Sequence, residues 1–450
     1  MATEALFDRH DREATLDFLE HVLALSTAQQ TELVIEADRQ SLTRFAGNQI
    51  HQNVSEFDCR LSIRAIENGC IGHSSTNKID EDAISDALQW ARDAAHLGNM
   101  KAEPAEFAGP QMYASLSNYS QRTADWPPRE RATMVSHLVE KCEPKGASAA
   151  GAVSNSESVL AVANSNGLRA YHSLTDANFT ATVSVNGSTG WCNCYSSDAL
   201  TLQAARWGKR ALGHAVIGRN PRPLEPGRYT VVLAEAAVKD LVELLCWLGL
   251  GAQALEEKRS FMCGKIGKRI TGKNITLADD AFHPLGIGFP FDYEGIPKQR
   301  VVLIEKGTAK SVAYDRAYGS RAGKTSTGHA VPARYTFGPL PLNVVLSPGK
   351  SDYVEMLRSL KRGLLVTRFW YCRIVDPAKT LITGQTRDGT FLVEDGKIVC
   401  GVRDMRFNES ILETFSRAEM ISRYLRRIGS TIVPAMKIED FRFTELVGEQ

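Results

Sequence analysis

The chain has 450 residues, of which 43% are hydrophobic and 23% charged, a composition typical of a globular protein rather than a disordered one. Its 53 Lys and Arg residues nearly balance its 52 Asp and Glu residues, so the net charge of +1 gives no general reason to expect a nucleic acid or an anionic membrane as a partner. No uninterrupted apolar run is long enough to predict a membrane span.

The first residues and the cysteines indicate a cytoplasmic protein. The start, MATEALFDRHDREATLDFLEHVL, is amphipathic and mixed in charge, and it lacks the basic beginning and apolar core of a signal peptide. The nine cysteines are odd in number and irregularly spaced. Without a secretory signal, we expect reduced thiols in the cytoplasm rather than a disulfide framework.

The first hundred residues predict an α+β domain, residues 1–100. Apolar side chains recur at helical spacing over 13–27, and a second helix is expected at 80–98, with acids in its first turn and a glycine after its end. Strands are expected at 32–39, at 41–57 as a hairpin turning at Gly47 and Asn48, at 58–69 and at 70–77. Residues 101–128 carry several prolines without a clean period, and predict a linker.

The central domain, residues 129–225, is predicted to be rich in strands. It begins with a helix over 128–144 and ends with a helix over 198–216. Between them the chain reads as short strands rich in Val, Ser, Thr and Asn, with the clearest turn at Asn164 to Gly167.

The last domain, residues 226–450, mixes helices and strands without regular alternation, which favours an α+β fold with mixed sheets over a parallel doubly wound sheet. A strand over 228–234 leads into a helix that ends in LLCWLGLGAQALEE, residues 244–257, and runs into a second helical segment. The later predicted elements are a hairpin over 300–315 turning at Lys306 and Gly307, a helix over 353–363, and strands at 364–375, 389–401 and 436–446.

Several catalytic motifs are absent from the sequence. No two of the ten histidines are closer than eleven residues, so no helix carries two histidines one turn apart with a glutamate between them, as a helical zinc peptidase requires. No phosphate-binding glycine loop, dinucleotide fingerprint or GxSxG nucleophile elbow occurs.

Two polar groups of residues are candidates for peptide binding. Arg44, Asn48, His51 and Asn53 crowd onto the hairpin predicted at 41–57, although a solvent-facing hairpin would need no ligand. Thr327 and His329 lie in a polar loop, TSTGHA, which can face a ligand or be a plain loop.

Two further groups have weaker claims to chemistry. Cys372 sits among aromatic residues, where a buried inert thiol is more common than a nucleophile. Asp279, Asp280 and His283 could hold a cation, but a solvated turn is the more common explanation of such a group.

Several long blocks resemble the TldD/PmbA family of cytoplasmic peptidase proteins. LTRFAGNQIHQNVSE and LSIRAIENGCIGHSSTN are similar to its N-terminal signature, and FDYEGIPKQRVVLIEKG with YDRAYG to its C-terminal domain. LLVTRFWYCRIVDPAKTLITGQTRDGTFLVEDGKI and RFNESILE continue the resemblance, which extends from about residue 30 to about 445. It implies the three-domain TldD/PmbA architecture.

The family has two branches, and the chain resembles the TldE (PmbA) branch. In the TldD branch a helix carries HExxxH and a late cysteine completes a zinc site. In the corresponding region this chain has Cys246, Trp247, Gly249 and Gly251, and no cysteine follows Cys400. The resemblance implies no cofactor in this chain, and a heterodimer with a TldD-like subunit whose zinc cleaves unfolded or ribosomally made, modified peptides.

Two alternatives stay open at the level of sequence. The chain could be a peptidase in its own right, with a dispersed metal site or with Cys372 as the nucleophile. It could also be a homodimeric peptide-binding scaffold that has no peptidase partner.

Overall fold

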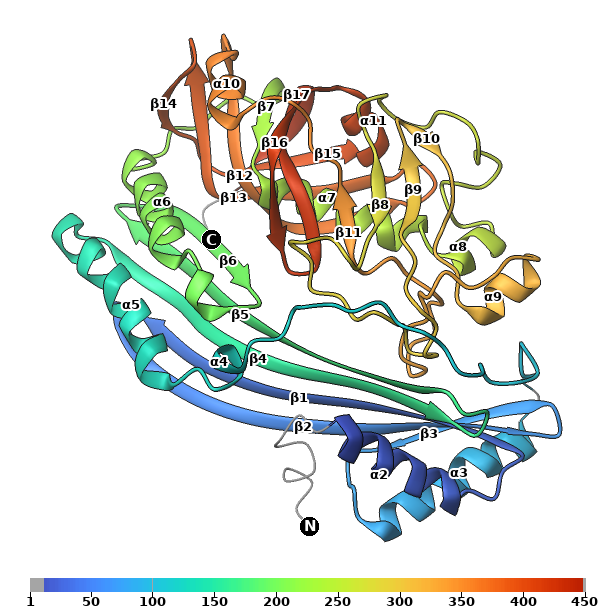
Figure 1. Ribbon diagram of the computed structural model, residues 1–450. Helices are drawn as coiled ribbons and strands as arrows, with labels where there is room; N and C mark the ends of the chain where they lie inside the picture. Colours follow the sequence, from blue (N-terminus) through green and yellow to red (C-terminus); the bar gives the residue numbers. More distant parts are fainter. Residues whose placement is uncertain (1–11, 99, 448–450) are drawn as a thin grey trace.

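The computed structural model describes residues 12–98 and 100–447 (Figure 1). Its helices are α2 (Arg12–Leu25), α3 (Glu81–Leu97), α4 (Gln121–Ala124), α5 (Pro128–Cys142), η1 (Glu143–Lys145), η2 (Ala199–Thr201), α6 (Ala204–Ile217), α7 (Glu235–Gly249), α8 (Ala252–Glu256), α9 (Arg316–Arg321), α10 (Tyr353–Arg358) and α11 (Ile411–Ser416). Among these described helices, none has the length and apolar character needed to cross a membrane.

The strands outnumber the helices and complete an α+β fold, as predicted. They are β1 (Gln30–Ala46), β2 (Gln49–Glu67), β3 (Cys70–Thr76), β4 (Ser148–Asn164), β5 (Arg169–Val185), β6 (Ser188–Ser196), β7 (Gly227–Leu233), β8 (Leu277–Asp279), β9 (Val301–Glu305), β10 (Thr308–Ala309), β11 (Val344–Leu346), β12 (Arg362–Asp376), β13 (Leu381–Glu394), β14 (Lys397–Gly401), β15 (Met405–Ser410), β16 (Ala418–Ile428) and β17 (Thr431–Leu446).

The first six strands form one antiparallel sheet in the order β3-β2-β1-β4-β5-β6. Because β1 pairs with β4, the predicted N-terminal and central domains share a continuous sheet. The prediction of short central strands was wrong, since β4 and β5 have 17 residues each. Small and β-branched residues continue the two-residue alternation through the polar stretches, so no turn interrupts these strands.

The two faces of this sheet have different coverings. Leu33 and Ile35 of β1 pack with α2 and α3 on one face. Val34 points to the opposite face, where it packs with Phe291 of the C-terminal part, because successive strand side chains alternate. At the other end of the sheet, α5 and α6 cover a separate core. The C-terminal part therefore lies against the face that α2 and α3 leave open (Figure 1).

The C-terminal strands form an eleven-stranded mixed sheet. Within it, β7, β12, β13, β15 and β17 pair in turn and β17 pairs back with β7, which closes a ring of strands. The predicted turn at Lys306 and Gly307 is confirmed between β9 and β10, with both residues at positive φ. The hairpin turn predicted at Gly47 and Asn48 is confirmed in the same way.

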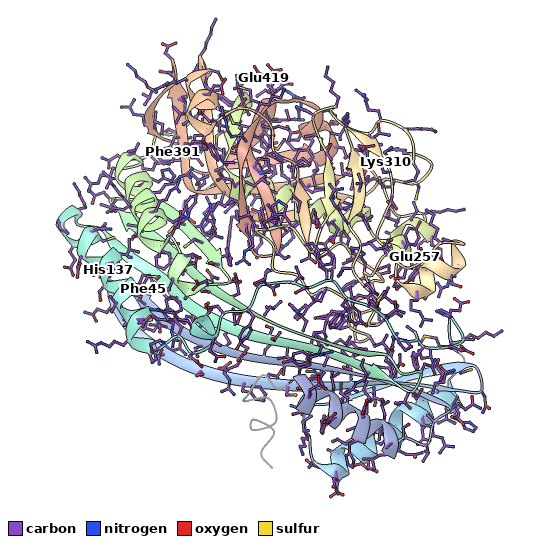
Figure 2. The ribbon with its side chains drawn as sticks, viewed as in Figure 1. Phe45, His137, Glu257, Lys310, Phe391 and Glu419 are labelled. Carbon is purple, nitrogen blue, oxygen red and sulfur yellow. The ribbon has the colours of Figure 1, made fainter. Side chains whose placement is uncertain are left out.

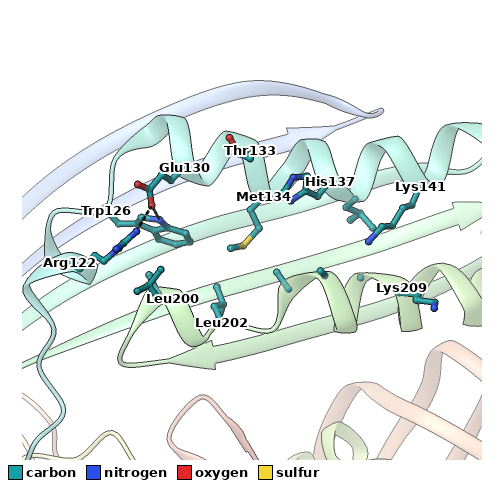
Figure 3. A pocket seen from close by; sticks show the side chains of 15 residues that line it. Arg122, Trp126, Glu130, Thr133, Met134, His137, Lys141, Leu200, Leu202 and Lys209 are labelled. Atoms are coloured by element: carbon teal, nitrogen blue, oxygen red, sulfur yellow. Dashed lines mark hydrogen bonds and ion pairs between the residues drawn. The ribbon is translucent and has the colours of Figure 1, made fainter.

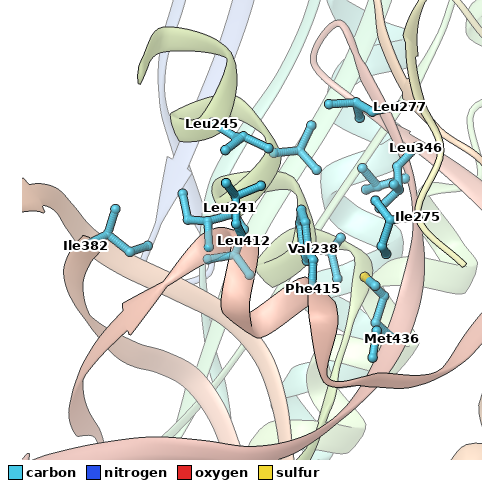
Figure 4. Packing of buried hydrophobic residues seen from close by; sticks show 14 of the residues in the cluster. Val238, Leu241, Leu245, Ile275, Leu277, Leu346, Ile382, Leu412, Phe415 and Met436 are labelled. Carbon is cyan, nitrogen blue, oxygen red and sulfur yellow. The ribbon is translucent and has the colours of Figure 1, made fainter. Parts of the chain in front are cut away.

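Helix α7 is the central helix of the largest core (Figure 4). Val238, Leu241 and Leu245 recur at helical spacing and are fully buried, where they pack with residues such as Phe415 and Met436. The packing of these side chains therefore accounts for the helix without any catalytic role.

Residues 101–120, which we call the crossing segment, run between the sheet and the C-terminal part (Figure 1). Tyr113 donates its hydroxyl proton to the carbonyl of Gly295 at 2.8 Å, and the Asn118 amide donates to the carbonyl of Gly288 at 2.8 Å. Ala108 is buried, and its carbonyl oxygen accepts a hydrogen bond from the side-chain amide of Asn164, the last residue of β4. The crossing segment is thus anchored to both the sheet and the C-terminal part, although other residues in it, such as Met112, are exposed.

Candidate functional site

The candidate site is the end of α7, the region that the family resemblance singled out. The predicted run of one helix into a second is confirmed: α7 ends at Gly249, and α8 begins at Ala252 after a break at Leu250 and Gly251. Cys246 and Gly249 are buried, whereas Trp247 is 53% exposed.

The helix breaks at Gly251 because another segment lies against its backbone. The amide of Ala252 donates to the carbonyl of Ala313, and the amide of Ala313 donates to Leu250, both at 2.9 Å. A Cβ atom added to Gly251 would lie 2.1 Å from the carbonyl oxygen of Pro339. This position admits only glycine unless the backbone moves.

We expect Gly251→Ala to lower the free energy of unfolding by about 1–3 kcal/mol, because the Pro339 backbone must move. Gly213→Ala in α6 is the matched control, since a Cβ there meets nothing within 4 Å. That control should be neutral or stabilise by up to about 1 kcal/mol. Chemical denaturation of both variants measures the difference, and equal stabilities would contradict the close approach.

The side chains at the end of α7 do not suit zinc. Cys246 is the one ligand type in the run Cys246, Trp247, Leu248 and Gly249, and burial, together with Asp279 and Glu243, raises the pKa of its thiol well above the ordinary value. A cysteine that binds zinc does so as its thiolate. Among residues 12–98 and 100–447, no group of three or more His, Cys, Asp and Glu side chains is arranged to hold a metal ion. The side chains at the end of α7 thus differ from the HExxxH set of the TldD branch.

Trp247 instead begins a row of packed aromatic and guanidinium groups that leads from α7 to the first sheet. Its ring lies 5.0 Å from that of Phe337, which stacks on Tyr335 at the same distance. The guanidinium of Arg334 covers Tyr335 at 4.9 Å and binds Glu36 of β1 through both nitrogens, with Nη2 3.0 Å from Oε1. This aromatic row, Trp247–Phe337–Tyr335–Arg334, joins α7 to the sheet face.

The C-terminal part also holds a buried charged cluster, formed by Asp279, Asp292, Lys298 and His329. Nε2 of His329 is 2.9 Å from Oδ1 of Asp279, and both side chains are fully buried. Burial lowers the pKa of His329, with Lys298 adding to this and Asp279 opposing it. Burial also lowers the pKa of Lys298, whereas burial and Glu294 raise that of Asp292 to about 7.

This charged cluster explains the polar loop TSTGHA without a ligand. His329 has no exposed surface, and its Nδ1 is 2.9 Å from both the hydroxyl and the carbonyl oxygen of Thr327. Thr327 in turn accepts from the amide of Tyr314 at 2.9 Å. A peptide would need a rearrangement to reach His329, and the role of both side chains in peptide binding stays a prediction.

A buried ion network connects the sheet to the same region. Arg64 of β2 stands directly opposite Glu32 of β1, with its Nε 2.8 Å from Oε1 of Glu32. Its Nη1 also lies 3.2 Å from Glu294. Burial raises the pKa of Glu32, and Arg64 opposes that rise. The three side chains fix how the C-terminal part sits on the sheet.

The four hairpin candidates divide into two kinds. Asn48 is used by the fold, because its amide nitrogen donates to the carbonyl of Ala147 at 3.1 Å and its oxygen accepts from the amide of Ala149 at 2.7 Å. The oxygen of Asn53 accepts from Thr43 at 2.8 Å and from the buried Arg131 at 3.2 Å. Arg44 and His51 are exposed, and remain available to a ligand.

The structure does not bring the hairpin group and the loop group together. The aromatic row ends at Glu36, which is eight positions along β1 from Arg44. In an extended strand this separation is about 26 Å. Phe45, next to Arg44, lies near His137 of α5, at the opposite end of the molecule from Glu257 of α8 (Figure 2). The two groups therefore cannot form one compact site within this chain.

A groove between α5 and α6 lies at the hairpin end of the sheet (Figure 3). Its volume is about 340 Å³, and it is lined by Trp126, Met134, His137 and Leu202 among others. Trp126 donates its indole proton to Glu130 at 3.1 Å. The groove contains neither Arg44 nor His51 in its lining, so it does not extend the hairpin group.

The weaker candidates have structural roles. Burial, with a contribution from Asp240, raises the pKa of the Cys372 thiol to about 12, which leaves little thiolate at neutral pH. Asp280 accepts from the amide of Phe282 at 3.1 Å, and His283 accepts from the amide of Leu285 at 3.2 Å, as expected of a turn.

The sequence-based interpretation missed the charged cluster, the Arg64 network and the aromatic row. Residues 230 positions apart, such as Arg64 and Glu294, meet only after the sheet has formed. The usable signal was local: Arg64 is an ionisable residue within the mostly apolar run LSIRAI, and Glu32 begins the mostly apolar run ELVIEA.

Comparison with known proteins gives matches of family and fold. The model of the "PmbA/TldA metallopeptidase C-terminal domain" matches residues 226–445, and that of "PmbA/TldA metallopeptidase domain 1" matches residues 31–95. The chain superposes on TldE from Thermococcus kodakarensis with a TM-score of 0.85 at 20% identity, covering 96% of this chain and 99% of that one. A structure from Thermotoga maritima described as a modulator of a DNA gyrase superposes with a TM-score of 0.84 at 19% identity, covering 95% of this chain and 99% of that one.

Curated relatives share part of the sequence. Metalloprotease PmbA of Escherichia coli O157:H7 is 24% identical over 246 residues, which are 53% of this chain and 52% of that protein. A metalloprotease TldD homolog of Buchnera aphidicola is 26% identical over 228 residues, or 50% and 47% of the two chains. The chain thus spans about half the length of these relatives. From the two domain matches and the blocks that follow one another in order, the chain belongs to the TldD/PmbA metallopeptidase family.

Proposed function

We propose that this chain is a TldE/PmbA-type, non-catalytic subunit of a metallopeptidase. It would pair with a TldD-like subunit that carries the zinc, and the pair would cleave unfolded or ribosomally made, modified peptides. The observation that carries the proposal is the end of α7, where Trp247 points outward, Cys246 is buried as a thiol, and Gly251 fits tightly against Pro339. These residues serve packing and offer zinc no ligand set.

Peptide guidance would use backbone pairing. The edge strands of the six-stranded sheet are β3 and β6, and an extended peptide can add to an unpaired part of such an edge through main-chain hydrogen bonds. Selection by backbone suits a substrate that is recognised because it is unfolded. Arg44 and His51 on the exposed β1–β2 hairpin are proposed to assist, since neither is buried in the fold.

An exposed patch on β12 is the proposed contact with the TldD-like subunit. Phe369 belongs to the core, stacked on Phe441, whereas Trp370, Tyr371, Ile374 and Val375 are 42–66% exposed. The strand bulges between Trp370 and Arg373, and Tyr371 has φ 57°. Arginine guanidiniums cover both exposed rings at 4.7–4.9 Å. Large aromatic and arginine side chains of this kind dominate protein interfaces.

The test is metal content and proteolysis, measured on the untagged chain alone and after mixing with a TldD-like subunit that bears HExxxH. We expect near-zero zinc and no cleavage of an unfolded peptide by the chain alone, and chelator-sensitive cleavage by the mixture. Replacing the first histidine of the partner's HExxxH should abolish that cleavage, which assigns the chemistry to the partner.

The alternatives predict different outcomes of this test. One tightly bound zinc per isolated chain, with chelator-sensitive cleavage, would show a self-sufficient peptidase and overturn the proposal. Cleavage that is lost in Cys372→Ala would identify a cysteine enzyme. A stable homodimer that ignores the TldD-like subunit would identify a scaffold.

A further inference from the structure

A second cavity, of about 830 Å³, lies between the first sheet and the C-terminal part, and it is lined by four arginines. Arg206 and Arg210 come from α6, and Arg426 and Arg427 from β16. Its volume is within the range usual for small-molecule sites. The cavity contains none of the peptide-binding candidates, so it stands apart from the proposed peptidase role.

Three of these guanidiniums gather around one indole ring. Arg426 lies 3.7 Å from the centroid of Trp207, Arg210 lies at 5.3 Å and Arg206 at 5.7 Å. Arg210 also lies 4.9 Å from the ring centroid of Tyr353. Nη2 of Arg426 already donates to Asn193, and the other guanidinium nitrogens around the ring can serve a further partner, because arginine commonly combines stacking with anion recognition.

Negative charge at the cavity is too small to balance these arginines. Among the described residues, Arg427 pairs with Asp176, and Glu235 lies 4.0 Å from Arg426. Arg206 donates to the neutral amide oxygen of Gln203 at 3.1 Å. Among the residues that line the cavity, Glu235 thus provides the one carboxylate to balance the charges of Arg206, Arg210 and Arg426. Gathering like charges in a partly buried site is unfavourable unless an anion binds among them.

Two other features favour an anion in this cavity. The buried hydroxyl of Tyr353, which lines it, interacts with the guanidinium of Arg210 and still has its own proton to donate to a ligand. Glu235 is the first residue of α7, and the amides at a helix N-terminus carry partial positive charge. A hydroxyl donor, helix amides and guanidiniums all suit oxygen anions.

We infer that this cavity binds a small multivalent anion, whose phosphate or carboxylate groups are held by Arg206, Arg210 and Arg426. The Trp207 ring positions the guanidiniums, and the polar rim, including Ser196 and Thr201, admits water and further oxygen atoms. The site is formed by both halves of the chain, so its occupant also ties α6 to β16.

Isothermal titration of the full chain at low salt, with inorganic pyrophosphate and separately with citrate, tests the inference. We expect saturable binding of at least one anion. Arg210→Gln should weaken it about tenfold or more through the lost charge-assisted contacts. Arg206→Gln, at an exposed position, should also weaken anion binding. This variant tests the inference if Arg210→Gln is unfolded. Tighter pyrophosphate binding would identify phosphate as the preferred group, and tighter citrate binding carboxylate.

Lys209→Gln is the matched control, because Lys209 is the neighbour of Arg210 but lines the groove between α5 and α6 (Figure 3). It removes the same charge from the same helix, and should leave binding within twofold. The absence of saturable binding of either anion at millimolar concentration would overturn the inference. Equal weakening by Lys209→Gln would also overturn it, since net charge and not the cavity would then govern binding.

Discussion

Arg64→Met is expected to lower the free energy of unfolding by about 3–5 kcal/mol, because it leaves Glu32 and Glu294 without their shared cation. Glu32 is fully buried, and its Oε2 already lacks a hydrogen-bond partner among the described residues. Arg92→Met is the control, since Arg92 is 39% exposed and 3.8 Å from Glu67. A surface pair of this kind contributes at most about 1 kcal/mol. Urea denaturation of both variants measures the two losses.

The Arg64→Met loss should depend on pH. The folded-state pKa of Glu32 is already raised by burial, and removing Arg64 raises it further. A carboxyl group with a raised folded pKa takes up a proton on folding, so its contribution is present at low pH and disappears as pH rises through the folded pKa. The loss should therefore be smaller at pH 5 than at pH 8. Adding Glu32→Gln should recover part of it at pH 8, and a loss no larger than that of Arg92→Met would contradict the role of the network.

Tyr371→Ala is expected to weaken binding to a TldD-like subunit by about 30-fold or more, the effect of removing an aromatic side chain at the centre of an interface. Tyr424→Ala is the matched control, because Tyr424 has the same 66% exposure on another strand. The control should change the affinity by less than threefold. Surface plasmon resonance with the immobilised partner measures both variants.

The two tyrosine variants also locate the interface. Both side chains are exposed, so both variants should keep the stability of the natural chain, and a loss of binding reports contact rather than unfolding. If Tyr424→Ala weakens binding and Tyr371→Ala does not, the partner contacts β16 and the β12 assignment is wrong.

The elements that the sequence predicted well are those with local causes. Asp80 caps α3 by accepting the amide of Ala83 at 2.9 Å, and the acids of the first turn and Gly98 mark the same boundaries in the sequence. The Gly47–Asn48 and Lys306–Gly307 turns follow from residues that tolerate positive φ. The helix over 353–363 was predicted too long, because α10 stops at Arg358 and the chain turns into β12 at Arg362.

The candidate site was less predictable because its contacts are not local. Nothing in the sequence near His329 indicates that its side chain will be buried in contact with Asp279, fifty positions earlier. In the sequence, Asn48 and Asn53 look like exposed amides. Only the structure shows that Asn48 donates to Ala147, next to β4, and that Asn53 accepts from Arg131. The identity of the α7 region came from family resemblance, and the structure adds the physical reason that Gly251 must be glycine there.

The position of the crossing segment has a consequence for synthesis of the chain. Tyr113 is made 182 residues before its partner Gly295, and Asn118 is made 170 residues before Gly288. At ordinary translation rates of about 5–20 residues per second, the first of these delays lasts roughly 10–35 s. During that time the sheet face around Val34 lacks its cover. A nascent chain of this protein should therefore be a good client for chaperones that bind apolar strands, until residues 280–300 have left the ribosome.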